Sequence, residues 1–341
     1  MKLTLYPKGV RQWLWTLVRP ILFILAIIMS GLFTLFNMPG LSYTGPLPPL
    51  SEQEQHTAVL LEKHVHILAN EIGPRNIWRH SSMDRTVGYL EKVLSDMGYD
   101  VRRQQFRSYE VTSVNLEVEI VGHLYPEEIV VVGAHYDTVP YCPGANDNGS
   151  GVAALLELAR LLADSRLQRT VRLVAFANEE PPFFFSNKMG SAFYAARCRD
   201  RKENIVGMLS LETIGYYSDE IGSQHYPFPL SMFYTDTANF IGFVGNIRSR
   251  KLVRQTIEAF RNHTRFPSEG LAAPGFITGV GWSDHLSFWR KGYPAIMVTD
   301  TALFRYAAYH TTADTPEKLN YERMARVVTG LVPTLLELAN R

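Results

Sequence analysis

The stretch IVVVGAH, residues 129–135, begins with four β-branched residues and ends on a histidine. A run of apolar residues without polar interruption is typical of a strand buried on both faces, as in a sheet covered by helices. Similar strand-like runs occur at residues 114–121, 171–177, 208–211 and 295–299. The pattern therefore predicts several buried strands spread over more than half of the chain.

Helical patterns separate several of these strands. Residues 151–163 carry apolar side chains along one helical face, and similar stripes occur at 59–68 and at 87–94, where Gly98 follows as a stop signal. Strands that alternate with helices favour a sheet with helices on both sides. The sequence thus predicts an α/β fold with a mostly parallel central sheet flanked by helices, in three layers.

Composition and charge limit the class of protein. The chain has 341 residues, of which 46% are hydrophobic and 20% are charged, which is typical of a globular protein with a full core. Its net charge of +1 and scattered Lys and Arg residues give no basic surface, so we exclude nucleic acid as a partner. The two cysteines, Cys142 and Cys198, exclude a disulfide framework and leave open whether one bridge forms.

The amino-terminal segment has the pattern of a membrane anchor. Residues 20–36 carry no charge; Lys2, Lys8, Arg11 and Arg19 precede them, and the next Lys or Arg is Lys63. This asymmetry predicts a single-pass transmembrane helix with a cytoplasmic N-terminus. A cleaved signal peptide is the alternative, but FNMPGLSYTG, which follows, offers no clear cleavage site.

These patterns divide the chain into three parts. We expect residues 1–37 to form a cytoplasmic leader and transmembrane anchor, residues 38–50 a Pro-rich linker, and residues 51–341 the main domain. The main domain would then lie on the exported side of the membrane, periplasmic or extracellular.

Side chains that bind metals lie at the ends of the predicted strands. In open α/β sheets, ligands bind at the carboxyl edge of the strands, where adjacent loops form a crevice. Asp147 lies in a glycine-rich loop just before the predicted helix at 151–163. Zinc accepts carboxylates and neutral imidazoles, and five ligands that share one carboxylate suffice for two ions. The candidate ligands are His135, Asp147, Glu180, Glu212 and His310.

Glu179 is predicted to act on protons instead of binding a metal. It is adjacent to Glu180 at the end of a strand, where neighbouring side chains project in different directions. One carboxylate can therefore bind the metal while the other faces the bound water. Such a carboxylate can take the proton of the water and later give it to a leaving amine.

Six motifs contain or adjoin the candidate ligands: GAHYDTV, GANDNGSGVA, FANEE, SLETIGYY, WSDHLSFW and YHTTADTPEKL. In sequence and in order they resemble the zinc-dependent aminopeptidase family, which includes bacterial leucyl aminopeptidase and, more distantly, glutamate carboxypeptidase and glutaminyl cyclase. The resemblance extends over about residues 59–335 and implies that residues 51–341 form a zinc peptidase domain with two zinc ions.

The resemblance also implies how the ligands divide. Asp147 would bridge the two ions, His135 and Glu212 would bind the first, and Glu180 and His310 would bind the second. Many members of the family have aspartate where this chain has Glu212, so the longer side chain makes this ligand a departure from the family. Asp219, farther along the same loop, is the alternative ligand. The resemblance assigns the general base to Glu179.

Five further residues are candidates for supporting or substrate-binding roles. Asp137 is two residues after His135, so its carboxylate is expected to accept the other imidazole N–H of that ligand. Arg305 could bind a substrate carbonyl or carboxylate, or pair with Asp300 or Asp314. The complete set of supporting candidates is Asp137, Asp284, His285, Arg305 and Tyr309.

The function predicted from these residues is that of an aminopeptidase. A di-zinc-bound hydroxide would hydrolyse N-terminal residues from peptides, with Glu179 as the general base. Three alternatives stay open: an acyl transferase like glutaminyl cyclase, a carboxypeptidase of the same fold, and a non-catalytic ectodomain like that of a receptor. The carboxypeptidase needs a cationic pocket for the terminal carboxylate of its substrate, and the ectodomain would not need an intact ligand set.

Overall fold

The structure, a computed structural model, describes residues 9–341, so Lys2 and Lys8 of the leader lie outside the described residues. The chain divides into two compact units, Met1–Asn37 and Met38–Arg341. The first unit contains α1 (Val10–Phe36), and Trp13, Leu22 and Phe23 are among its exposed apolar side chains.

The predicted transmembrane helix is not confirmed. In the part of the chain that the structure describes, no helix combines the length and the apolar character that a membrane span requires. The uncharged run of residues 20–36 has 17 residues (36 − 20 + 1) and is preceded by Arg19. At a rise of about 1.5 Å per residue it covers about 26 Å, less than the roughly 30 Å of a hydrocarbon core.

The second unit is built on one sheet of eight strands. Their order is β1-β2-β4-β3-β5-β8-β6-β7. The bounds of the strands are β1 Arg102–Ser108, β2 Val111–Ile120, β3 Tyr125–His135, β4 Arg169–Phe176, β5 Asn204–Glu212, β6 Ile241–Gly245, β7 Ser268–Ala272 and β8 Ala295–Thr299. The α/β class is confirmed, and the five predicted strands correspond to β2, β3, β4, β5 and β8.

The sheet is mixed, so the prediction of a mostly parallel sheet is wrong. Strands β4, β3, β5 and β8 are parallel, whereas β1 with β2, β2 with β4, and β6 with β8 are antiparallel. Only two residues, Tyr109 and Glu110, join β1 to β2, and so short a connection can form only an antiparallel hairpin. The sequence pattern missed β1 because it is rich in charge, and β6 and β7 because they are short and contain glycine.

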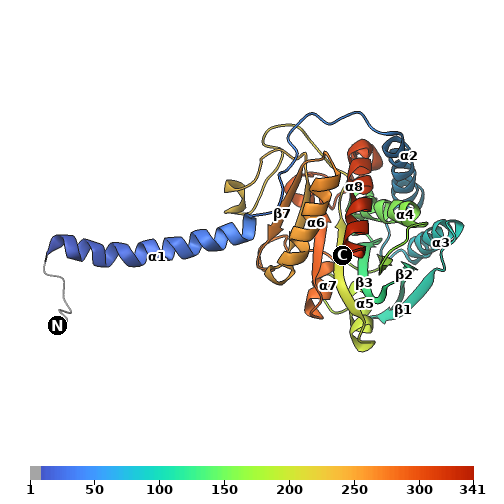
Figure 1. Cartoon of the computed structure of the whole chain (residues 1–341). Coiled ribbons are helices and arrows are strands. Elements are labelled where there is room, and N and C mark those ends of the chain that lie inside the picture. The colour runs from blue at the N-terminus through green and yellow to red at the C-terminus, as the bar shows by residue number, and fades with distance from the viewer. Residues whose placement is uncertain (1–8) are drawn as a thin grey trace. The chain divides into compact units, whose positions relative to one another are not determined.

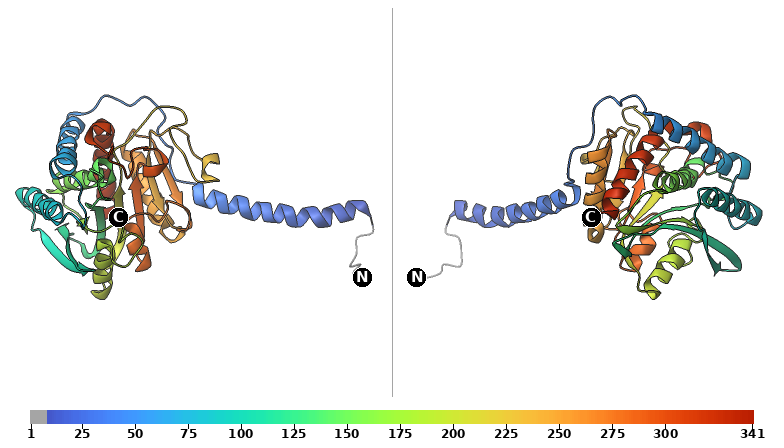
Figure 2. Two further views of the ribbon diagram at one scale, coloured as in Figure 1. Left: turned by 180° about the vertical axis from the view of Figure 1, so that it is seen from behind. Right: turned by 45° about the vertical axis from the view of Figure 1, so that its right-hand side comes forward.

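Helices cover both faces of the sheet (Figures 1 and 2). Val130 and Val132 of β3 point into one apolar core, whereas Ile129 and Val131 point into a second core on the opposite face. The first core is covered by α2 (Glu52–His66), α3 (His80–Asp96), α4 (Gly151–Leu162), α6 (Arg250–His263) and α8 (Tyr321–Ala339), and the second by α5 (Gly190–Asp200) and α7 (His285–Arg290). Both faces of the central strands are therefore buried, as their uninterrupted apolar sequences require.

Candidate metal centre

His135 and Glu212 end two adjacent parallel strands, β3 and β5. Because the two strands run side by side in register, their last side chains meet at the carboxyl edge of the sheet. The distance from His135 Nε2 to Glu212 Oε2 is 3.2 Å. Ser283 donates a hydrogen bond of 2.7 Å to the same Glu212 oxygen, which orients the longer side chain toward His135.

Asp147 lies between two histidines that come from distant parts of the chain. Its Oδ1 is 3.5 Å from His135 Nε2, and its Oδ2 is 2.9 Å from His310 Nε2. His310 Nε2 is also 3.3 Å from Glu180 Oε1. The five predicted ligands thus come together as two triads that share Asp147: His135, Asp147 and Glu212 form one, and Asp147, Glu180 and His310 form the other.

Three polar atoms at the centre of this cluster have charged neighbours but make no hydrogen bond. Among the described residues, His135 Nε2, Asp147 Oδ1 and Glu180 Oε1 are buried without a hydrogen bond. Burial, with the negative charge of Asp147 beside it, raises the pKa of Glu180 to about 7. Buried polar atoms without partners are costly, and a cation in each triad would satisfy them and stabilise the ionised carboxylates. The residues therefore fit two divalent cations with nitrogen and oxygen ligands, as zinc accepts.

Two residues that sequence reasoning missed hold the loop of Asp147. The carboxylate of Asp314 accepts hydrogen bonds from the backbone N–H groups of Asn146 and Asp147, at 2.8 and 3.1 Å. Arg75 is fully buried and donates to the carbonyl oxygens of residues 68, 136, 143 and 144. Asp314 lies within the motif YHTTADTPEKL, which could have indicated it, whereas the sequence around Arg75 has no comparable signal.

Glu179 lies beside the cluster and belongs to neither triad. Its carboxylate is buried, and Oε2 is 3.9 Å from His135 Nε2. Burial raises the pKa of Glu179 well above its usual range; His135 opposes this shift, and Glu180 and Glu212 add to it. A carboxylate that belongs to neither triad but lies 3.9 Å from a histidine of the first triad has the position that a proton acceptor needs.

Asp137 holds the two glutamates through their backbone. Its Oδ1 accepts from the N–H of Glu179 and its Oδ2 from the N–H of Glu180, both at 3.0 Å. The Nδ1 atom of His135 is 3.2 Å from the backbone oxygen of Asp137 and 3.5 Å from Oδ1. The main hydrogen bonds of the Asp137 carboxylate are therefore those with the backbone N–H groups of Glu179 and Glu180. The expected contact with the imidazole of His135 is longer and secondary to them.

Tyr309, Asp284 and His285 belong to neither triad. Tyr309 stacks on the ring of His310, with centroids 3.9 Å apart. Asp284 is buried, and burial raises its pKa to about 7. His285 donates a hydrogen bond from Nε2 to the carbonyl oxygen of Val280, 2.8 Å away, and burial lowers its pKa to about 4. Tyr309 can thus orient a ligand, and Asp284 is close enough for the charges of His135 and Glu212 to act on it, whereas His285 contacts Val280 and Trp289.

Arg305 and Asp219 have roles elsewhere. Arg305 is buried and donates to Gln224 Oε1 at 2.8 Å and to the carbonyl oxygen of Phe240 at 2.9 Å. Its Nε and Nη1 atoms are therefore engaged with protein groups, its Nη2 is buried without a hydrogen bond, and among the described residues it forms no ion pair with Asp300 or Asp314. Asp219 is exposed and pairs with Arg323, so the structure does not place this alternative ligand at the centre.

The two cysteines do not form a bridge. Cys142 and Cys198 are both buried and free. Burial raises the pKa of the Cys142 thiol to about 12, so this side chain is protonated near neutral pH.

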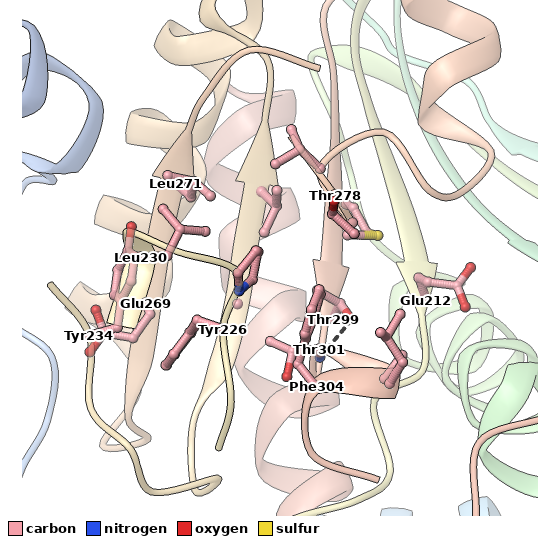
Figure 3. Close-up of a pocket in the computed structure, with 18 of the residues that line it drawn as sticks. Glu212, Tyr226, Leu230, Tyr234, Glu269, Leu271, Thr278, Thr299, Thr301 and Phe304 are labelled. Atoms are coloured by element: carbon pink, nitrogen blue, oxygen red, sulfur yellow. Dashed lines mark hydrogen bonds between the residues drawn. The ribbon is translucent and has the colours of Figure 1, made fainter. Parts of the chain in front are cut away.

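A pocket of about 90 Å³ opens beside the first triad (Figure 3). Glu212 and Tyr309 are among its lining residues, which joins it to the candidate metal centre. Most of its lining is apolar and comes from β6, β7, β8 and the segments at 226–240 and 278–280. A pocket that adjoins a cluster of metal-binding side chains is the natural place for a substrate.

The comparisons with known proteins agree with this geometry. The chain is 38% identical over 324 residues to the uncharacterized protein YfbL of Escherichia coli K12, a match that covers 92% of this chain and 97% of that protein. It also matches peptidase family M28 over residues 115–334.

Two solved structures share the fold at low sequence identity. The structure of BSAP, a zinc aminopeptidase from Bacillus subtilis, has a TM-score of 0.64 and 16% identity, and the match covers 86% of this chain and 97% of that one. A glutaminyl cyclase from Fimbriiglobus ruber has a TM-score of 0.57 and 19% identity, with 86% and 98% covered. The resemblance found in the sequence motifs is thereby confirmed at the level of the family: the chain is an enzyme that belongs to peptidase family M28.

Proposed function

We propose that the chain is an aminopeptidase that holds two zinc ions. His135, Asp147 and Glu212 would bind one ion, and Asp147, Glu180 and His310 the other. The observation that carries this proposal is the position of Asp147, whose two carboxylate oxygens face two different histidines at 3.5 and 2.9 Å. One carboxylate between two imidazoles is the arrangement that a pair of ions with a shared ligand requires.

The reaction is the hydrolysis of a peptide bond. When bound, zinc supplies a polarised scissile carbonyl and a water whose pKa is lowered to near ~7. Glu179 accepts the proton of the attacking water on its carboxylate and donates it to the nitrogen of the leaving amine, so that the hydroxyl group stays on the carbonyl carbon. Asp137 positions Glu179 by accepting its backbone N–H.

The charges around the site favour a substrate with a free amino terminus. The described lining of the pocket contains Glu212 and Glu269 but no lysine or arginine. A carboxypeptidase would need a cation there for the terminal carboxylate, and Arg305, the candidate for that role, is engaged with Gln224 and backbone carbonyls. An N-terminal ammonium group, by contrast, meets no cation among the described lining residues and lies beside the buried carboxylates of the triads.

Free and blocked peptides test the direction of cleavage. We expect an N-acetylated peptide to be cleaved about 10- to 100-fold more slowly, in kcat/KM, than the same peptide with a free amine, since one charge-assisted hydrogen bond is lost. The measurement is product release by the full chain with zinc and with a chelator, which should abolish it. Equal rates of cleavage for the two peptides would contradict the proposed aminopeptidase activity. Conversion of N-terminal glutamine to pyroglutamate would favour a cyclase instead.

We also propose that the peptidase domain lies on the exported side of a membrane, with the leader in the cytoplasm. The support is the charge asymmetry, with Arg11 and Arg19 before the apolar run and no Lys or Arg between Arg19 and Lys63. Exposed apolar side chains of α1, such as Leu22 and Phe23, add to it.

Protease protection tests this localisation. In sealed membrane vesicles of known orientation, we expect protease on the exported side to degrade the domain of residues 51–341, and protease on the cytoplasmic side to spare it. A chain that lacks residues 1–37 is the control and should not be associated with the vesicles. A full-length chain that alkaline carbonate strips from the membrane would contradict an integral anchor.

A further inference from the structure

Four residues form one row across the sheet from the metal centre to the far end of the pocket. Glu212 of β5 pairs with Thr299 of β8, Thr299 with Gly242 of β6, and Gly242 with Glu269 of β7. Paired residues of neighbouring strands project on the same face, and all four line the pocket. Three strand spacings of about 4.8 Å separate Glu212 from Glu269 by about 14 Å along this row.

Between the two glutamates, the pocket has no projecting side chain from β6, and it is bordered by apolar residues. Gly242 has no side chain, so no side chain from β6 stands between Thr299 and Glu269 in this row. The next row on the same face consists of Met297, Val244 and Leu271, which also line the pocket. A side chain that enters from the metal centre therefore crosses an apolar surface before it reaches Glu269.

Glu269 ends this pocket as a carboxylate without a protein partner. Among the described residues, no hydrogen bond or ion pair involves its side chain, although the residue is half-buried. Arg261 is the cation whose charge acts on Glu269, but its guanidinium donates to Ser268 and to the backbone oxygens of Pro39 and Gly40. Burial raises the pKa of Glu269, and Arg261 opposes this shift only in part. A bound cation would therefore be stabilised there.

Two tyrosines lie at the same end of the pocket. Figure 3 shows Tyr226, Tyr234 and Glu269 grouped opposite Glu212. The two rings are stacked, with centroids 5.6 Å apart, and both hydroxyl groups donate to backbone oxygens, of Thr235 and Gly270. With their hydroxyls engaged, the tyrosines offer aromatic surface beside a carboxylate. Carboxylates and aromatic faces together bind ammonium and guanidinium groups.

We propose that this pocket receives the side chain of the substrate's N-terminal residue and selects lysine and arginine, with Glu269 as the specificity-determining residue. The aliphatic stem would lie on Met297, Val244 and Leu271, and the terminal cation would pair with Glu269 beside the two tyrosines. The inference rests on the proposed aminopeptidase function, because the residue in the pocket must be the one whose peptide bond lies at the triads.

Lysine and norleucine substrates test the role of Glu269, because their side chains differ at the terminal ammonium and share the same aliphatic stem. With aminoacyl-coumarin amides and the zinc-loaded full chain, we expect kcat/KM for lysine to exceed that for norleucine about 10- to 100-fold. In Glu269→Gln this ratio should fall to near one. Glu258→Gln, on an exposed part of α6 outside the pocket, removes the same charge and should keep the ratio of the wild type.

Binding separates a failure of this inference from a failure of the proposed function. Lysinamide and norleucinamide carry the same two side chains and can be titrated calorimetrically into the wild type and Glu269→Gln. If lysinamide binds more tightly than norleucinamide and Glu269→Gln removes this difference, the role of Glu269 is supported. This holds even if neither coumarin amide is cleaved, because the lack of cleavage would overturn only the proposed aminopeptidase activity. Equal Kd values for the two amides in the wild type, or a preference that survives in Glu269→Gln, would overturn the role of Glu269.

Discussion

Replacing Glu179 with glutamine is expected to lower kcat about 10³-fold, within the range of about 10² to 10⁴ that a general base contributes. This factor corresponds to about 4 kcal/mol of transition-state stabilisation. Glutamine keeps the size of the side chain, and the backbone N–H of residue 179 can still donate its hydrogen bond to the Asp137 carboxylate. The amide side chain, however, cannot accept the proton of the attacking water. Because Glu179 belongs to neither triad, the zinc content should stay at the wild-type level. Steady-state kinetics and metal analysis of the same preparations provide the two measurements.

The adjacent residue provides the sharpest comparison. Glu180→Gln changes the next residue in the same way, but Glu180 Oε1 lies 3.3 Å from His310 Nε2 within the second triad. We therefore expect Glu180→Gln to lose zinc as well as activity. Glu220→Gln, in an exposed position, is the control for the loss of one charge and should behave like the wild type. If Glu179→Gln kept kcat within about threefold of the wild type, its assignment as the base would be wrong.

Replacing Asp147 with asparagine is expected to disrupt both metal sites at once. Each carboxylate oxygen of Asp147 faces a different histidine, and an asparagine offers only one oxygen and no charge. Mutation of residues that only support metal ligands lowers metal affinity about 10- to 100-fold. Loss of the shared ligand should therefore lower the affinity for zinc at least ~100-fold. Zinc titration and metal analysis after dialysis should show fewer than two ions per chain, and activity should be lost.

Asp219→Asn is the matched control for this prediction. Asp219 is the other acidic candidate considered for the centre, and the structure shows it exposed and paired with Arg323. Its replacement should leave the zinc content and kcat/KM unchanged. Retention of two tightly bound ions in Asp147→Asn would rule out a shared ligand, and loss of an ion in Asp219→Asn would return that residue to the ligand set.

The positions of the candidate ligands could be predicted from the sequence because they follow recognisable strands. His135 and Glu212 end strand-like runs that are mainly apolar, and Glu180 comes three residues after a third such run. Runs of this kind identify buried strands without knowledge of their neighbours. The carboxyl ends of parallel strands meet at one edge, so convergence of these side chains follows from the pattern.

The residues that support the ligands could not be predicted in this way. Asp314 and Arg75 act through hydrogen bonds to backbone groups of the loop at 143–147, and a backbone partner leaves no pattern in the sequence. Arg305 shows the reverse error. Its closeness to His310 in the chain made it a candidate for substrate binding or for an ion pair with Asp300 or Asp314, but the side chain is buried among backbone carbonyls and Gln224.

The sequence by itself determined the α/β class, the family and the set of candidate ligands, because apolar periodicity and motif chemistry are local properties of the chain. Only the tertiary structure decided that the sheet is mixed, that Asp147 lies between His135 and His310, and that Glu269 lies in one row with Glu212. These features depend on strand pairing and register between distant segments. Strand register is set by packing across the whole sheet, and no single segment contains that information.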